Sequence, residues 1–150
     1  MTSSSADLPP GHLAYYRQHD ISPVHYAMSG IEEHFQRRDA LYRTLGLPPV
    51  AFAGVRVLEV APGSGQNSLY VAAQQPAAYE LIEPNPTGLR DIVAAYASFE
   101  QPHTAPVVHP VRLEDYEMDA PFEIVLCENW LGSAANELKL IRLLADLVAP

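Results

Sequence analysis

Hydrophobic positions along the chain fall into short continuous runs separated by longer stretches with helical spacing. Four short runs rich in β-branched and aromatic residues predict buried strands, at 55–60, 79–82, 107–111 and 122–127. Helical spacing predicts helices that begin at Ser29, Gly65, Asn85 and Ser133. The alternation of strands and helices predicts an α/β fold, a doubly wound parallel sheet with helices on both faces.

Residue types at the predicted helix starts agree with known capping rules. Ser29 and Glu32 match the capping box, in which each side chain satisfies a backbone donor near the other. Asn85 followed by Pro86 supplies an N-cap and a proline at the first helical position. Ser133 is the expected cap of the last helix.

The apolar positions of three helices indicate which side of each packs on the sheet. The expected inward residues are Ile31, Phe35, Tyr42 and Leu45 in the first, Leu89, Ile92, Val93 and Tyr96 in the third, and Leu138, Ile141, Leu144 and Val148 in the last. Arg38 interrupts the first of these faces. We interpret it, with Arg37, as part of a solvated helix surface.

The N-terminal region divides into two parts. Residues 1–11 combine Ser, Pro and Gly with little to bury, which predicts disorder. Residues 12–28 are crowded with aromatic side chains, which predicts an arm that docks on the domain as a lid. The expected organisation is therefore a flexible N-terminus and aromatic-rich arm over 1–28, followed by one domain over 29–150.

Composition narrows the function classes. A net charge of −9, with 9 basic residues against 18 acidic ones, argues against a nucleic-acid partner. No apolar run reaches the roughly 20 residues that cross a bilayer, so no membrane partner is expected. Cys127 is the only cysteine, which fits a reducing cytoplasm. The histidines show no metal-binding spacing, so no metal site is expected.

The segment with the clearest chemistry follows the first predicted strand. Glu59 ends that strand, and Gly63 and Gly65 make the turn into a helix, where backbone N–H groups can approach a ligand. An acid at this position repels a pyrophosphate and attracts an ammonium group. Glu83 ends the second strand, where a carboxylate can accept hydrogen bonds from ribose hydroxyls.

These motifs resemble those of the class I S-adenosylmethionine-dependent methyltransferases, from Val55 to about Ala149. Glu59, Ala61, Gly63 and Gly65 match the family's first motif, with alanine in place of its usual first glycine, and Glu83 matches the second. The resemblance implies a Rossmann-like sheet of about four strands in the order 3-2-1-4. It also implies S-adenosylmethionine as cofactor and direct in-line transfer of its methyl group to a small-molecule acceptor. The cofactor-binding residues that it implies are Glu59, Ala61, Pro62, Gly63, Gly65, Glu83, Pro84, Leu113, Glu114 and Asn129.

Several questions stay open at this level. No catalytic residue is assigned. An NAD(P)-binding oxidoreductase domain and a non-catalytic methyltransferase-like module remain alternatives. Strand four would be an exposed hydrophobic edge, so we expect self-association or a further C-terminal segment to cover it.

Overall fold

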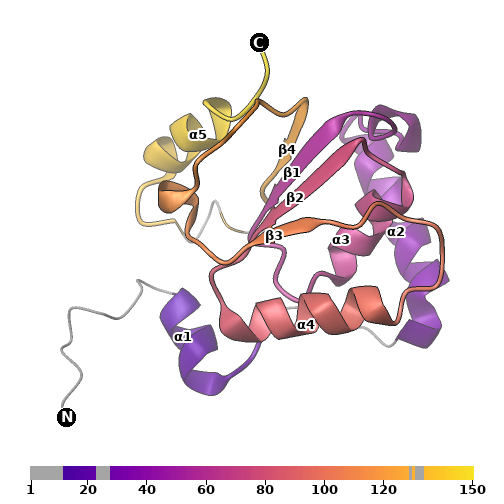
Figure 1. Cartoon of the computed structure of the whole chain (residues 1–150), viewed down its shortest axis with the longest axis horizontal. Coiled ribbons are helices and arrows are strands. Elements are labelled where there is room, and N and C mark those ends of the chain that lie inside the picture. Colours follow the sequence, from indigo (N-terminus) through magenta and orange to yellow (C-terminus); the bar gives the residue numbers. More distant parts are fainter. Residues whose placement is uncertain (1–11, 23–27, 129, 131–133) are drawn as a thin grey trace.

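A four-stranded parallel sheet forms the centre of the protein, in a computed structural model that describes residues 12–22, 28–128, 130 and 134–150 (Figure 1). Its strands are β1 (Arg56–Val60), β2 (Ala78–Ile82), β3 (Val107–His109) and β4 (Ile124–Leu126). They lie in the order β3-β2-β1-β4, which confirms the predicted order. β1 is therefore central, pairing with β2 on one side and β4 on the other.

Helices cover both faces of this sheet, as the sequence predicts. The helices are α1 (His12–His19), α2 (Ile31–Thr44), α3 (Gln66–Ala73), α4 (Pro86–Ala97) and α5 (Glu137–Ala145). Figure 1 shows α5 on one side of the strands and α2, α3 and α4 on the other. Because side chains alternate along a strand, Val57 packs towards α2 and α3, whereas Leu58 packs towards α5.

Two of the predicted helix starts need correction. The predicted capping box at Ser29 is wrong. α2 begins at Ile31, its N-cap residue is Gly30, and no side chain forms a capping hydrogen bond there. Ser133 lies outside the described residues, and α5 is instead capped by Asn136, whose side chain accepts from the Lys139 backbone N–H. The predicted cap at Asn85 and the first-turn proline of α4 are confirmed.

Parts of the predicted inward faces are also wrong. Leu45, Val93, Leu138, Ile141 and Val148 are between 42% and 67% exposed. In α5 the buried position is Leu140, with Leu143 and Leu144 half-buried, and Leu147 is buried two residues after the helix ends. Leucines occupy several sides of this helix, so hydrophobic spacing alone does not select the one that meets the sheet.

After α5 the chain returns to the sheet beside β4. Val148 forms a parallel bridge with Phe122. The Phe122 N–H donates to the Leu147 carbonyl at 3.0 Å, and the Ala149 N–H donates to the Phe122 carbonyl at 2.8 Å. This pairing lies two residues before the start of β4.

Among the described residues, we find no helix with the length and apolar character needed to cross a bilayer. Residues 1–11, for which the sequence predicts disorder, lie outside the described part of the chain.

The packing of α3 against α4 leads to the first prediction. Gly65 has φ +75°, and an added Cβ would lie 2.7 Å from Ile92 Cγ1 and 3.1 Å from its Cα. Gly46 has a similar φ of +78° but open space around its Cβ position. We expect Gly65→Ala to lower the free energy of unfolding by about 2–4 kcal/mol, since backbone strain and overpacking add. Gly46→Ala should cost about 1–2 kcal/mol, from strain alone. Urea unfolding of both variants tests this, and equal losses would show that the contact with Ile92 carries no cost.

Candidate functional site

A cavity of about 580 Å³ opens at the carboxyl ends of the strands. Its floor includes the ends of β1 and β2, and its walls include residues that follow β3 and β4. Neighbouring strands β1 and β4 mark the point where the strand order reverses. In open parallel sheets this point is the usual ligand-binding position. The volume lies within the range of about 300–1,000 Å³ that is typical of small-molecule sites.

The loop between β1 and α3 has an unusual backbone. Ala61, Gly63 and Gly65 have φ values of 58°, 63° and 75°, all in the left-handed region. Glycine adopts this conformation freely, whereas alanine pays about 1–2 kcal/mol for it. Gly63 and Gly65 therefore adopt this loop conformation without strain. Ala61, which lines the cavity, adopts it at a cost in backbone strain.

Glu83, at the end of β2, is fixed by backbone donors. Its carboxylate accepts from the Gly63 N–H at 3.0 Å and from the Asn85 N–H at 2.7 Å. It is 4% exposed and lines the cavity. Burial raises the pKa of Glu83 to about 7, although the two N–H groups and the charge of Arg17 oppose this rise. Near neutral pH a modest change in its surroundings alters its ionisation.

Glu59, at the end of β1, is the second buried acid of the cavity. It is 3% exposed and accepts a hydrogen bond from the Tyr79 hydroxyl. Burial raises the pKa of Glu59 above its ordinary value, and the hydrogen bond from the Tyr79 hydroxyl opposes the rise. The cavity therefore has acidic groups at its floor, where a cationic group of a ligand would be favoured and an anionic one disfavoured.

A third acid, Glu128, follows β4 and is held by side chains of α2. Arg38 binds its carboxylate with both terminal nitrogens, one of them at 2.8 Å, and the Tyr42 hydroxyl donates to it at 2.6 Å. Burial alone would raise the pKa of Glu128, but these hydrogen bonds and the Arg38 charge lower it below its ordinary value. The prediction that Arg38 lies on a solvated surface is wrong, since its side chain is 9% exposed. It points inward because Glu128 compensates its charge, a long-range pairing that helical spacing does not reveal.

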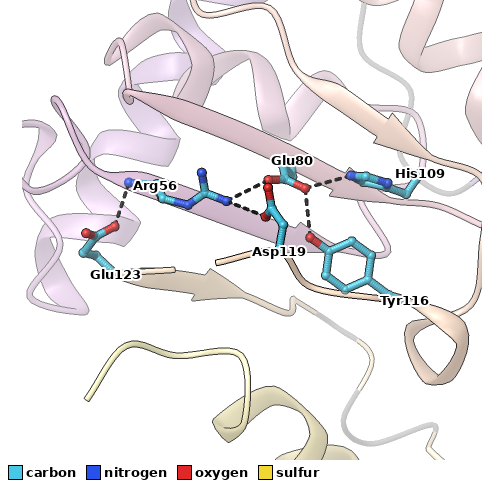
Figure 2. Close-up of polar contacts among 6 residues, drawn as sticks. All are labelled: Arg56, Glu80, His109, Tyr116, Asp119 and Glu123. Carbon is cyan, nitrogen blue, oxygen red and sulfur yellow. Dashed lines mark hydrogen bonds and ion pairs between the residues drawn. The ribbon is translucent and has the colours of Figure 1, made fainter. Parts of the chain in front are cut away.

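The segment after β3 forms another wall of the cavity and is anchored by polar side chains. Arg112, Leu113 and Glu114 line the cavity, with Leu113 5% exposed. Figure 2 shows the anchor, centred on the Glu80 carboxylate in β2. Glu80 accepts from the Tyr116 hydroxyl at 2.8 Å and from Arg56 at 3.1 Å, and its carboxylate lies 2.8 Å from His109 Nε2 (Figure 2). These contacts hold the segment on the sheet, although β3 itself is only three residues long.

Most of the residues that the family resemblance implies gather around this one cavity. Those that line it are Glu59, Ala61, Pro62, Gly63, Glu83, Pro84, Leu113 and Glu114. Gly65 is not part of the lining and instead allows α3 to approach α4. Asn129 lies outside the described residues. The placement is observed, and the binding role of each residue stays a prediction.

Several lining residues lie outside the cofactor-binding set that the family resemblance implies. These are Leu13 and Tyr16 in α1, Asn67 in α3, Glu128 and Trp130 after β4, and Asn136, Lys139, Leu140 and Leu143 at α5. The wall after β4 is mainly apolar apart from Glu128 and the polar residues of α5. The sequence signal for this wall is Glu128, which directly follows the fourth predicted strand as Glu83 follows the second.

The contrast between Arg38 and its neighbour gives a prediction about stability. Removing one partner of a largely buried ion pair leaves the other charge uncompensated, so Arg38→Gln should lower the free energy of unfolding by about 2–4 kcal/mol. Arg37→Gln is the matched control: its side chain is 58% exposed, and the change should stay within about 0.5 kcal/mol. Urea unfolding at neutral pH measures both. Similar small losses would contradict the buried network.

A second prediction follows from the raised pKa of Glu83. The pKa of this carboxyl is about 4.5 in the unfolded chain and about 7 in the folded protein. Its charged form therefore disfavours folding. Its contribution to wild-type stability is therefore lost as pH rises from about 4.5 to about 7. Glu83→Gln lacks this titration. The stability of the variant relative to the wild type should rise by about 3 kcal/mol between pH 4 and pH 8. Urea unfolding across this range tests the prediction, and parallel pH curves would refute it.

Comparison with known proteins places this geometry in a fold family. No family model and no curated protein sequence matches the chain. Solved structures do match it.

Magnesium protoporphyrin IX methyltransferase (ChlM) from Synechocystis PCC 6803, with bound SAM, has a TM-score of 0.64 and 13% identity, over 99% of this chain and 74% of that one. An S-adenosylmethionine-dependent methyltransferase from Mesorhizobium loti has a TM-score of 0.58 and 16% identity, over 75% of this chain and 49% of that one. The plantazolicin methyltransferase BpumL, in complex with SAH, has a TM-score of 0.55 and 15% identity, over 81% and 49%. With its parallel sheet in the order β3-β2-β1-β4, the chain has the Rossmann-like fold of the class I S-adenosylmethionine-dependent methyltransferases.

Proposed function

We propose that the cavity binds S-adenosylmethionine and that the protein transfers its methyl group to a small-molecule acceptor. The observation that carries the proposal is the position of Glu83, buried at the end of β2 and bonded to the glycine loop. There its carboxylate lines the cavity beside the point where the strand order reverses. A carboxylate in this place is suited to accept hydrogen bonds from the two hydroxyls of a ribose.

The residues of the cavity fit this cofactor. Glu83 would hold the ribose, Leu113 provides an apolar wall for the adenine, and Glu59 would face the ammonium group of the methionine part. The left-handed backbone at Gly63 lets the loop approach a ligand without a side chain intervening. Two of the matched structures contain the cofactor or its product, since ChlM was solved with bound SAM and BpumL with SAH.

The same features weigh against a nicotinamide-dependent oxidoreductase. The buried acid Glu59 lies at the start of the loop that would have to receive a pyrophosphate. Ser68 occupies the third glycine position of the dinucleotide-binding pattern, where glycine or alanine usually permits close packing of the helix on the strand. The matched structures quoted above are methyltransferases.

When bound, the cofactor would supply a methyl group carried by a sulfonium sulfur. The sulfur would be left as a neutral thioether after the transfer. The chain therefore has mainly to position an acceptor and to keep water away. Trp130, Leu140 and Leu143 form the apolar part of the wall that serves this purpose. Glu128 is a poor proton acceptor because Arg38 and Tyr42 stabilise its charged form. Its expected contribution is a fixed negative charge that orients polar groups in the cavity.

We place the protein in the cytoplasm, on the basis of its single cysteine.

Titration by calorimetry with S-adenosylmethionine, S-adenosylhomocysteine and NADH tests the proposal. We expect saturable binding of the two sulfur ligands and none of NADH. Glu83→Ala should weaken binding by about tenfold or more, because a charge-assisted hydrogen bond contributes about 1.5–3 kcal/mol. Glu33→Ala serves as the matched control, since the Glu33 side chain is 81% exposed on α2 and should leave affinity unchanged. Binding of NADH without the sulfur ligands would overturn the proposal.

A further inference from the structure

The described part of the aromatic-rich arm, residues 12–22, lies against the segment that follows Glu83. Figure 1 shows α1 beside the start of α4, far from it in sequence. Leu13 and Tyr16, three residues apart on one side of α1, line the cavity. The arm therefore contributes to the same cavity as the strand ends, and its attachment bears on what the cavity holds.

Hydrogen bonds fix the arm to residues 84–91. Arg17 Nη2 donates to the Pro84 carbonyl at 2.6 Å. Asn85 Nδ2 donates in the other direction, to the Ile21 carbonyl at 3.0 Å. Pro84 and Asn85 directly follow Glu83, so these hydrogen bonds hold the backbone next to Glu83, including Asn85, whose N–H donates to the carboxylate.

Asp20 and Ser22 extend the attachment along α4. The Asp20 carboxylate accepts from the Thr87 hydroxyl and from Arg90 Nη2, the latter at 2.7 Å. Ser22 is 5% exposed, and its hydroxyl donates to Asp91. Hydrogen bonds to Thr87 and Arg90 lower the pKa of Asp20, so its charge persists at neutral pH.

The arm also acts on Glu83 through charge. Groups facing the Glu83 carboxylate are the Gly63 and Asn85 N–H groups, the Arg17 guanidinium of α1 and the Glu59 carboxyl of β1. Arg17 favours the ionised form of Glu83, whereas Glu59 and burial oppose it. The ionised form is the one that accepts two hydroxyl hydrogen bonds. Docking of the arm and ligand binding at Glu83 thus favour the same state.

We propose that Arg17 is a positioning residue and that the docked arm, held by Arg17 and Asp20, is coupled to ligand binding at Glu83. The inference rests on the proposed function, because the ligand is an adenosyl compound whose ribose meets Glu83. By thermodynamic reciprocity, the docked arm tightens ligand binding and the ligand stabilises the docked arm. Leu13 and Tyr16 then slow ligand release by covering the cavity.

The test measures release of S-adenosylhomocysteine from the full chain by stopped flow. Trp130 is the only tryptophan and lines the cavity, so its fluorescence reports on occupancy. We expect the combined Arg17→Gln and Asp20→Asn variant to release the ligand about fivefold to tenfold faster, since several exposed contacts are lost together. Arg142→Gln, an exposed arginine of α5 outside the cavity lining, is the matched control.

Two further readouts separate positioning from a loss of fold. In Arg17→Gln the pH at which ligand affinity falls should move upward, because Glu83 loses a favourable charge, and Arg17→Lys should restore it. Chymotrypsin cleavage after Tyr15 and Tyr16 should be faster in the double variant, and in the wild type the ligand should slow it.

The outcomes distinguish the two proposals. If the wild type does not bind S-adenosylhomocysteine, the proposed function fails, and the coupling fails with it. If the wild type binds but the double variant releases ligand at the wild-type rate, with the same pH midpoint, only the coupling is overturned.

Discussion

Two backbone N–H groups, from Gly63 and from Asn85, donate to the carboxylate of Glu83 at the end of β2. One donor belongs to the loop after β1 and the other to the start of α4, so a single side chain joins the parts that surround the cavity. Gly88 makes room for this arrangement, since an added Cβ there would lie 3.0 Å from Glu83 Cδ and 2.9 Å from the Gly63 carbonyl. The carboxylate is costly to bury, and burial raises its pKa to about 7 although both N–H groups oppose the rise.

The remaining acids of the cavity depend on different compensation. The Tyr79 hydroxyl donates a hydrogen bond to Glu59, whereas the guanidinium of Arg38 pairs with Glu128. Burial of Glu59 and Glu83 beside the partly exposed Glu128 costs stability, and it creates a negative field at the strand ends when these acids are ionised. Such a field suits a ligand that carries positive charge and no phosphate. The fold alone does not dictate this preference, since parallel sheets of this kind also hold dinucleotides.

The sequence predicts the doubly wound parallel sheet and the cap at Asn85, because both depend on local residue types and on the rules of parallel sheets. The strand order and the acids at the strand ends are what the family resemblance implies. The sequence does not predict the inward position of Arg38, whose partner Glu128 is 90 residues away. It also does not predict which face of α5 is exposed, because leucines lie on several sides of that helix. Docking of the arm depends on polar contacts such as that between Arg17 and Pro84, which leave no periodic signal in the sequence.

A crystal structure of the chain with S-adenosylhomocysteine tests the central claim most directly, because it locates the ligand relative to Glu83. We predict both ribose hydroxyls within hydrogen-bond distance of the Glu83 carboxylate, the adenine against Leu113 and the amino group of the homocysteine part towards Glu59. A ligand bound away from Glu83, or one whose ribose faces solvent, would contradict this account of the cavity.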